Sequence, residues 1–287
     1  MTHQLIITAD DYGMCAPVNT AIEDCLAAGA MRATCVMANM PLWRDAAQLR
    51  QRFPDASIGL HWTLTQGSPV LPAEKVPSLV DNTGNFRSFA ALRSRALRQQ
   101  VNLDEVQAEL IAQYVRFFEV AGAPDFWNTH ENIHVSPGLF GVFVRVGREL
   151  CIPVMRCQRR ITAPSTGTPE GYVLRHPFYW LKGLVIAYWS ARAERLGMLM
   201  PDGAIHTPGY RAGETRIEDA LKRVPWAKIQ RAAELIIHPA TMVDRELFGN
   251  VTESRVRDYQ VFRDPGLKDR LLKAGVNPVG FEVLHGK

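Results

Sequence analysis

Two adjacent aspartates follow a short apolar run near the start of the chain. The run "LIITA", Leu5–Ala9, contains β-branched residues and is typical of a buried strand, and Asp10, Asp11 and then the turn-forming Gly13 come after it. Carboxylates are rarely buried without a partner. A pair of them at the C-terminal end of a strand therefore indicates a site that uses their charge.

Three histidines occupy comparable places at the ends of other predicted strands. His61 closes "IGLH", His130 closes "FWNTH" and His238 closes "ELIIH". The C-terminal ends of parallel strands meet on one face of a sheet or barrel, so side chains far apart in sequence can meet there. Two neutral imidazoles and one carboxylate suit Zn²⁺ or a similar divalent ion and leave positions open for water and a substrate oxygen. The pattern therefore predicts a metal-ligand set of Asp11 with two of these histidines.

Asp10 fits a different role from its neighbour. Adjacent strand residues point to opposite sides unless a turn redirects one, so the two carboxylates are not expected to bind one ion alike. A base beside a metal-bound water suits Asp10 better. His134, four residues after His130, is a candidate partner outside the ligand set. Singly, each residue has an ordinary explanation as a helix cap or a hydrogen-bonded core residue, but together at strand ends they favour a site.

Strands and helices alternate along most of the chain and must position these side chains. Repeated βα units imply a parallel sheet. The helix over Leu103–Val120 has the strongest periodicity, with Asn102 as its cap and Gly122 as its stop. The predicted strands are Leu5–Ala9, Arg32–Asn39, Ala56–His61, Asp125–His130, Ile152–Cys157, Ala204–His206, Glu234–His238 and Pro278–Glu282, and the other helices are Val18–Ala28, Leu42–Phe53 and Pro137–Leu150.

The composition limits the class of protein. With 287 residues and 47% hydrophobic content the chain can bury a full core, and we expect one α/β domain over residues 1–287. The net charge of +4 is small, and no basic run exceeds "RCQRR" at Arg156–Arg160, so nucleic-acid binding has little support. The five cysteines form no CxxC pair, which predicts reduced, structural thiols. The first residues lack the features of a signal peptide, which predicts a cytoplasmic protein.

Two regions interrupt the alternation. The first, an insertion at about residues 65–100, carries turn signals around short helical pieces and is typical of a lid or pocket wall. The second, at about residues 160–200, holds an aromatic-rich apolar run, Phe178–Trp189, interrupted by Lys182. A membrane span needs roughly 20 apolar residues, so this run is too short to cross a bilayer. It fits either an interfacial membrane element or a buried helix of the barrel wall.

Five segments match the sequence motifs of a known family: "IITADDYGMCAPVNTAI", "IGLHWTLTQGSPVLP", "NTHENIHVSPGLF", "ELIIHPA" and "RVRDYQVFRDPGLKDRLLKAG". Together they resemble the YdjC-like carbohydrate deacetylases and, within them, the hopanoid-biosynthesis-associated HpnK branch, over nearly the whole chain. The resemblance implies a (β/α) barrel-like fold, complete or incomplete, with inserted loops. It also implies metal-dependent removal of the acetyl group from N-acetylated amino sugars, with Zn²⁺ as the ion and Mg²⁺ as the alternative.

The resemblance also implies a role for each candidate residue. The metal ligands would be Asp11, His61 and His130, with Asp10 as general base and His238 as general acid. Independently of the resemblance, the positions of His134 and Trp62 near the ligands make them candidate substrate contacts, and the indole of Trp62, just after His61, would either stack on a sugar face or pack beneath the loop. The chain departs from the usual motifs of the family at two positions. The sequence from His130 to His134 lacks the usual middle histidine, and "HPA" replaces "HPG" at His238.

The HpnK resemblance suggests a lipid-linked substrate, an N-acetylglucosaminyl group on a bacteriohopane polyol such as bacteriohopanetetrol. The protein would then contact the inner membrane peripherally through Phe178–Trp189. A deacetylase of soluble chitobiose-like oligosaccharides would keep the same site without an apolar surface. A metal-dependent sugar isomerase or phosphoesterase would carry more acidic ligands or phosphate-binding glycines, which we do not find. A catalytically inactive binding protein would lack an intact Asp10.

Overall fold

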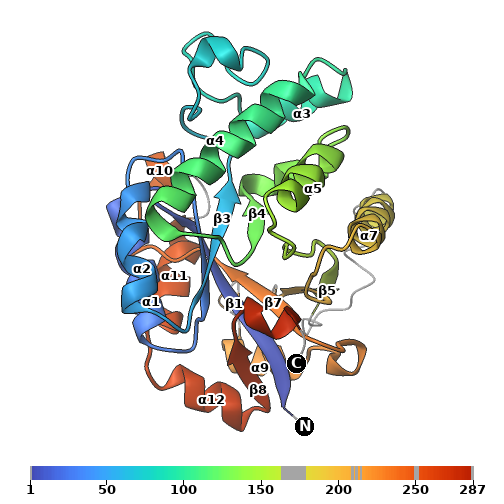
Figure 1. The fold of residues 1–287 in the computed structure, drawn as a ribbon. Coiled ribbons are helices and arrows are strands. Elements are labelled where there is room, and N and C mark those ends of the chain that lie inside the picture. Colours follow the sequence, from blue (N-terminus) through green and yellow to red (C-terminus); the bar gives the residue numbers. More distant parts are fainter. Residues whose placement is uncertain are drawn as a thin grey trace. The chain divides into compact units, whose positions relative to one another are not determined.

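The computed structural model describes residues 2–162, 179–207, 210, 213, 215–248 and 252–285. The chain forms two compact units. The central unit comprises residues 10–19 and 34–155, and the terminal unit comprises residues 1–9, 20–33 and 156–287. β1 (His3–Tyr12) and α1 (Ala16–Ala27), which Figure 1 labels, each have residues in both units. The single domain expected from the sequence stays a prediction.

A parallel sheet around β1 organises the terminal unit. β1 pairs with β7 (Ala233–Ile237) and with β8 (Val276–Val279). β6 (Gly203–His206) pairs with β7, and β5 (Arg160–Thr162) pairs with β6. The apolar residues of β1, Leu5 to Ile7, are fully buried, as a core strand requires. The described helices of this unit include α7 (Tyr179–Arg195), α9 (Ile217–Lys222), α10 (Arg245–Phe248), α11 (Thr252–Phe262) and α12 (Leu267–Lys273), with short 3-10 turns at Trp226–Lys228 and Phe281–His285.

Two parallel strands of the central unit, β3 (Ser57–Trp62) and β4 (Trp127–Thr129), carry site residues. His61 on β3 stands opposite Asn128 on β4 in the register. The end of β1 lies beside the chain that follows β2 (Ala33–Val36), because the N–H of Met37 donates to the Tyr12 carbonyl at 2.8 Å. Besides the long α4 (Leu103–Ala121), which packs against β3, the unit has α2 (Leu49–Arg52), α3 (Phe89–Leu97), α5 (Phe140–Glu149) and 3-10 turns at Trp43–Gln48, Ala73–Lys75 and His130–Val135.

The predicted α/β, barrel-like class is confirmed, since the ladders β1–β7, β1–β8, β3–β4, β5–β6 and β6–β7 are all parallel. The predicted ends of the longest helix are confirmed as well. The side chain of Asn102 accepts the N–H of Asp104 at 2.9 Å and so caps α4. Gly122 follows α4 with a φ of 69°, a conformation that suits a residue without a Cβ atom.

Several predicted strand boundaries are wrong. Ile152–Cys157 forms only an isolated bridge, and the strand of this region is β5 instead. β1 continues through both aspartates to Tyr12. The strand predicted at Asp125–His130 is β4 and ends at Thr129, and His130 begins a 3-10 turn. The extended backbone does not continue, because the two residues after His130 have φ values of 53° and 56°. The last strand, predicted at Pro278–Glu282, is β8 and ends at Val279.

Buried polar side chains of α4 hold the start of the insertion at residues 65–100. Glu109 is fully buried and accepts the N–H groups of Val70 at 2.8 Å and Leu71 at 3.0 Å. Gln113, one turn further along α4, accepts the N–H of Thr63 and donates to its carbonyl. The loop that leaves β3 is therefore fixed by α4 just beyond His61.

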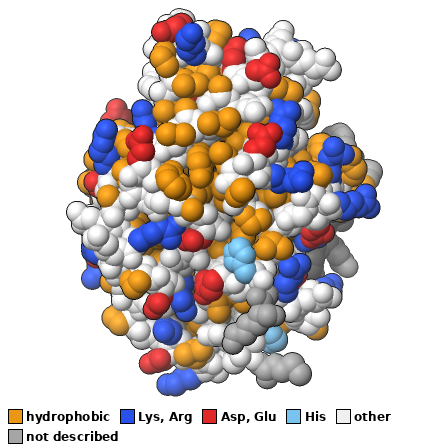
Figure 2. All heavy atoms as spheres, viewed as in Figure 1, with side chains coloured by type: hydrophobic (Ala, Val, Ile, Leu, Met, Phe, Trp, Pro, Cys, Tyr) orange, Lys and Arg blue, Asp and Glu red, His pale blue; other side chains and the backbone are white. Residues whose placement is uncertain are grey.

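Part of the apolar run Phe178–Trp189 lies outside the described residues, namely Phe178 itself and the side chains of residues 179–182. The rest belongs to α7. Its inward face is buried at Ile186, whereas Leu184, Val185 and Tyr188 are 57%, 41% and 58% exposed. Figure 2 shows apolar and basic side chains next to each other at the place of this helix. None of the described helices is long and apolar enough to cross a bilayer.

Candidate metal centre

The backbone at the end of β1 brings two carboxylates to one histidine. Asp11 has a φ of 76°, in the left-handed region, which interrupts the alternation of side chains along the strand. Asp10 and Asp11 are 4% and 1% exposed, so both carboxylates are buried. Each belongs to a separate cluster of potential ligand atoms, and both clusters include His61. The turn that would redirect one of two adjacent aspartates is therefore present.

The predicted ligands Asp11, His61 and His130 form the first cluster. Oδ1 of Asp11 lies 3.3 Å from Nε2 of His61 and 3.2 Å from Nδ1 of His130. The two imidazole rings meet edge to face, with centroids 5.5 Å apart. β1 and β3 supply the first two residues, and the 3-10 turn after β4 supplies His130. The structure therefore brings together residues separated by up to 119 positions, from Asp11 to His130, in a chain of 287 residues.

The donor atoms of this cluster fit a divalent cation. A carboxylate oxygen only accepts hydrogen bonds, and a neutral imidazole nitrogen without a proton does the same. Such atoms, facing one another in a buried place, need a proton or a metal ion between them. Atoms that bind Zn²⁺ at about 2.1 Å in a tetrahedral arrangement lie about 3.4 Å apart, close to the spacing seen here. The set of one carboxylate and two imidazoles also suits that chemistry.

The second cluster joins Asp10 to residues that the sequence analysis did not assign to the site. The thiol of Cys35 and the Nδ2 amide of Asn128 each donate to Oδ1 of Asp10 at 3.2 Å. Oδ1 of Asn128 lies 2.5 Å from Nδ1 of His61. Cys35 was expected to be a small hydrophobe and is fully buried, but its thiol also faces a carboxylate. The sequence offered one indication that Asn128 has a special role, namely its place inside a predicted strand, where asparagine is disfavoured.

The electrostatics of the first cluster favour protonation of His130 when no metal is bound. Burial alone lowers the pKa of this imidazole, but the hydrogen bond and the charge of Asp11 raise it more, with help from Glu131 and Asp10. The net result is a pKa above the ordinary value for histidine. A proton and a metal ion therefore compete for the same carboxylate-imidazole pair.

Neither predicted substrate contact presents itself to a sugar. The side chain of Trp62 is 0% exposed, so it does not offer its ring to a sugar. Its indole N–H donates to the Leu110 carbonyl, and its ring packs beside Trp127 and Phe143. Its surroundings fit the other role considered for Trp62, packing beneath the loop. His134 is 1% exposed, with Nδ1 2.6 Å from the Thr129 hydroxyl next to the ligand His130. It therefore lies behind the ligand-bearing strand end.

His238 belongs to the terminal unit, just after β7. Its N–H donates to Oδ2 of Asp258 on α11 at 2.9 Å, and the hydroxyl of Tyr210 donates to Oδ1 of the same carboxylate at 2.9 Å. The N–H of Ala240 also donates to the carbonyl of Arg255, on the same helix, at 3.2 Å. Helix α11 therefore fixes the loop that carries His238.

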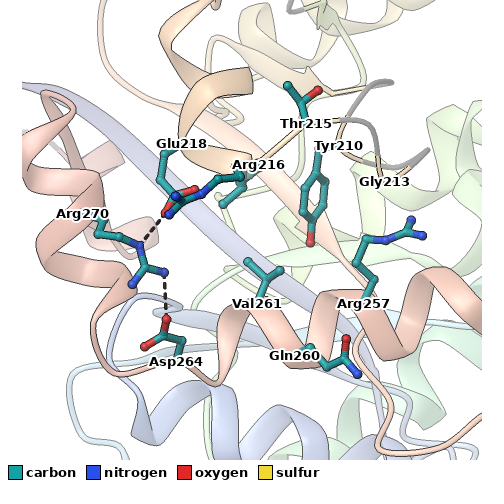
Figure 3. A pocket seen from close by; sticks show the side chains of 11 residues that line it. Tyr210, Gly213, Thr215, Arg216, Glu218, Arg257, Gln260, Val261, Asp264 and Arg270 are labelled. Atoms are coloured by element: carbon teal, nitrogen blue, oxygen red, sulfur yellow. Dashed lines mark hydrogen bonds and ion pairs between the residues drawn. The ribbon is translucent and has the colours of Figure 1, made fainter.

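Tyr210 also lines a cavity of about 430 Å³ in the terminal unit (Figure 3). One carboxylate oxygen of Glu218 forms ion pairs with both Arg216, at 3.1 Å, and Arg270, at 2.5 Å. Arg270 also pairs with Asp264 at 2.9 Å. The remaining lining residues are Gly213, Thr215, Ile217, Arg257, Gln260 and Val261. The described charges of this cavity are thus largely paired with one another, and no predicted ligand lines it.

Comparison with known proteins gives consistent matches. The sequence model described as "YdjC-like protein" matches residues 4–273. A "Chitooligosaccharide deacetylase" of Proteus mirabilis is 35% identical over 174 residues, which span 60% of this chain and 66% of that protein. A "Carbohydrate deacetylase" of Danio rerio is 35% identical over 50% of this chain and 46% of its own, so these two relatives match over less than two thirds of their length.

Other matches extend over the whole chain. A "Carbohydrate deacetylase" of Geobacillus stearothermophilus is 26% identical over 99% of both chains. A solved protein of Enterococcus faecalis V583, to which cellobiose-phosphate cleavage was provisionally attributed, aligns over 99% of both chains with a TM-score of 0.73 and 23% identity. At that identity the structural likeness establishes the fold alone.

Proposed function

The chain belongs to the family of YdjC-like proteins, and from this premise we propose that it is a metal-dependent carbohydrate deacetylase. It would hydrolyse the acetamide of an N-acetylated amino sugar to acetate and a free amine. The names of the relatives support the reaction class, since they are carbohydrate and chitooligosaccharide deacetylases. The observation that carries the proposal is the cluster of the buried Asp11 and His61 with the partly buried His130, and a second buried carboxylate, Asp10, beside it.

Each residue has a chemical task in this reaction. Asp11, His61 and His130 would hold the ion through one carboxylate oxygen and two imidazole nitrogens. A divalent ion held there lowers the pKa of water and stabilises negative charge on the acetamide oxygen. Asp10 would take the proton of the attacking water. Because an amine leaves poorly without protonation, His238 would supply a proton to the departing nitrogen.

The proposed substrate is a lipid-linked sugar, an N-acetylglucosaminyl group on a hopanoid such as bacteriohopanetetrol, as in the HpnK branch. The exposed side chains of α7, Leu184, Val185 and Tyr188, support contact with a lipid. Two arginines in the last turn of the helix, Arg192 and Arg195, would attract an anionic membrane surface. A soluble chitobiose-like oligosaccharide is the alternative substrate and needs none of these side chains.

The reaction is tested by acetate release from N-acetylated chitooligosaccharides and from an N-acetylglucosaminyl hopanoid. We expect turnover by the wild type with Zn²⁺ or Mg²⁺, loss after chelation, and recovery on adding back the ion. Asp10→Asn should keep the ion while kcat falls roughly 10²–10⁴-fold, as for other general bases. If Asp10→Asn empties the site, Asp10 is a ligand and not a base. Absence of acetate release from every N-acetylated sugar would contradict the reaction itself.

The lipid contact is tested by replacing Leu184, Val185 and Tyr188 together with serine. This variant avoids Ile186, which is buried at 9% exposure and would report on folding instead. Each exposed apolar side chain that enters a membrane contributes roughly 25 cal/mol per Å² of buried area, so three of them suffice for reversible binding. We expect weaker binding to anionic liposomes and a higher KM for the glycolipid, with unchanged activity on a soluble sugar.

A matched control comes from the central unit. Leu97, Val115 and Phe118 are 58%, 49% and 50% exposed, so replacing them with serine removes a similar amount of apolar surface. This control should bind liposomes like the wild type. Equal liposome binding by both triple variants and the wild type would remove the support for a membrane contact and favour the soluble oligosaccharide.

A further inference from the structure

One amide side chain connects the proposed base to a proposed metal ligand. Asn128 is fully buried on β4 and stands opposite His61 in the register of β3 and β4. Its Nδ2 group donates to Oδ1 of Asp10 at 3.2 Å, and its Oδ1 atom lies 2.5 Å from Nδ1 of His61. All three residues belong to the central unit.

The amide determines which nitrogen of His61 carries the proton. An amide oxygen has lone pairs and no hydrogen, so the contact with His61 is a hydrogen bond only if Nδ1 is the donor. In the neutral imidazole Nε2 then has the free lone pair. Nε2 is the atom that faces Asp11 at 3.3 Å. Asn128 therefore selects the tautomer that a metal ion between Asp11 and His61 requires.

The other end of the amide orients the base. Oδ1 of Asp10 receives the N–H of Asn128 and the thiol of Cys35, both at 3.2 Å, and both donors are fully buried. If the amide were turned by 180°, its oxygen would face the carboxylate of Asp10 and its N–H₂ group would face Nδ1–H of His61. Both contacts would be unfavourable. The carboxylate of Asp10, which can only accept, therefore fixes the orientation of the amide, and the amide oxygen in turn requires the proton of His61 on Nδ1.

We propose that Asn128 is a positioning residue with two tasks, holding His61 as the Nδ1–H tautomer for metal binding and orienting Asp10. The inference rests on the proposed function, because it assumes that His61 is a ligand and Asp10 a base. Cys35 assists only with the second task. Asn128 touches neither the ion nor the substrate and acts through these two residues.

The direct test reads the tautomer in the metal-free protein by two-bond ¹H–¹⁵N correlation spectra of the histidine rings. In the wild type, Nδ1 of His61 should carry a proton, with or without a second proton on Nε2 opposite Asp11. Asn128→Asp keeps an oxygen acceptor for Nδ1–H and should keep the tautomer, whereas Asn128→Ala should shift His61 towards the Nε2–H form. An Nε2–H tautomer in the wild type, or an unchanged tautomer in Asn128→Ala, would overturn the proposal.

A competition titration with a fluorescent zinc chelator gives a second readout. Loss of a ligand's hydrogen-bonding partner commonly lowers metal affinity by about 10–100-fold, which we expect for Asn128→Ala. Asn128→Asp and Cys35→Ala should bind Zn²⁺ nearly as the wild type does. Both should nevertheless lose kcat, with little change in KM, because they disturb only Asp10. If Asn128→Asp loses Zn²⁺ affinity as far as Asn128→Ala, the two tasks are not separable and the proposal fails.

His61→Ala distinguishes failure of this inference from failure of the proposed function. This variant should lose Zn²⁺ binding whatever Asn128 does. Full Zn²⁺ affinity in His61→Ala would contradict the metal centre itself. A merely structural role of Asn128 would lower the melting temperature of both Asn128 variants together without separating metal affinity from kcat. Should Asn128→Ala fail to fold, the comparison of Asn128→Asp with Cys35→Ala and His61→Ala still decides the matter.

Discussion

Asp11 combines a buried carboxylate with a backbone conformation that few residues other than glycine adopt. Its φ of 76° is strained for a residue with a Cβ atom, and aspartate is among the side chains that tolerate this region best. Strain of this kind persists where surrounding contacts hold it. Here it lets neighbouring carboxylates serve separate clusters around His61. A strand with regular alternation would send one of them to the other face.

The charge of Asp11 makes the stability of the metal-free protein depend on pH through His130. The pKa of His130 is raised in the folded chain, because Asp11 more than offsets the effect of burial. The contribution of the pair is therefore complete below the ordinary histidine pKa of about 6.5 and is lost as pH rises through the raised value. Urea unfolding of the chelated protein over this pH range should show the decline. His130→Gln should flatten it.

His285→Gln, which replaces a histidine outside the cluster, is the control for this measurement and should retain the slope of the wild type. A decline that survives in His130→Gln would mean that another group titrates. Zn²⁺ should bind more weakly as pH falls through the raised pKa, because the proton then occupies the imidazole.

At the scale of elements, α4 links the insertion at residues 65–100 to the strand that bears His61. Glu109→Ala removes the acceptor of two backbone N–H groups, those of Val70 and Leu71. Each donor left buried without a partner costs about 1–3 kcal/mol, so we expect a loss of about 3 kcal/mol in the free energy of unfolding. Urea denaturation followed by circular dichroism measures it.

Glu105→Ala is the matched control one turn earlier on α4. Its carboxylate accepts one N–H, that of Ser78, at 2.7 Å in a partly buried place. One such bond contributes about 1 kcal/mol. Equal destabilisation by the two variants would show that the paired bonds of Glu109 do not anchor the insertion.

Helix α11 performs a similar task for His238. Asp258→Ala removes the acceptor of the His238 N–H and of the Tyr210 hydroxyl. A misplaced catalytic group commonly costs roughly 10²-fold, so kcat should fall to that extent while metal content stays the same. Asp258→Asn keeps one oxygen acceptor and should recover part of the rate. Asp264→Ala, at the nearby cavity, should leave kcat unchanged, and wild-type turnover in Asp258→Ala would contradict a role for this loop.

At the scale of the whole molecule, the sequence predicts well what depends on local pattern. Apolar runs located β1, β3 and β7, and Asn102 with Gly122 located the ends of α4. The strand-end histidines were found because parallel strands share a polarity. What it could not predict depends on side-chain contacts between distant segments. The thiol of Cys35 and the amide of Asn128 matter only because β2 and β4 bring them to Asp10.

Metal binding offers the last test, because an ion that binds only the folded chain stabilises it by mass action. The proposed ligands are 50 residues or more apart, as with Asp11 and His61, so the unfolded chain cannot present them together. Zn²⁺ at 100 times its Kd should add about 2.7 kcal/mol to the free energy of unfolding, visible as a higher melting temperature in calorimetry. His61→Ala should abolish the gain, whereas Asp10→Asn should retain it. If His61→Ala is stabilised as strongly as the wild type, the ion binds elsewhere on the molecule.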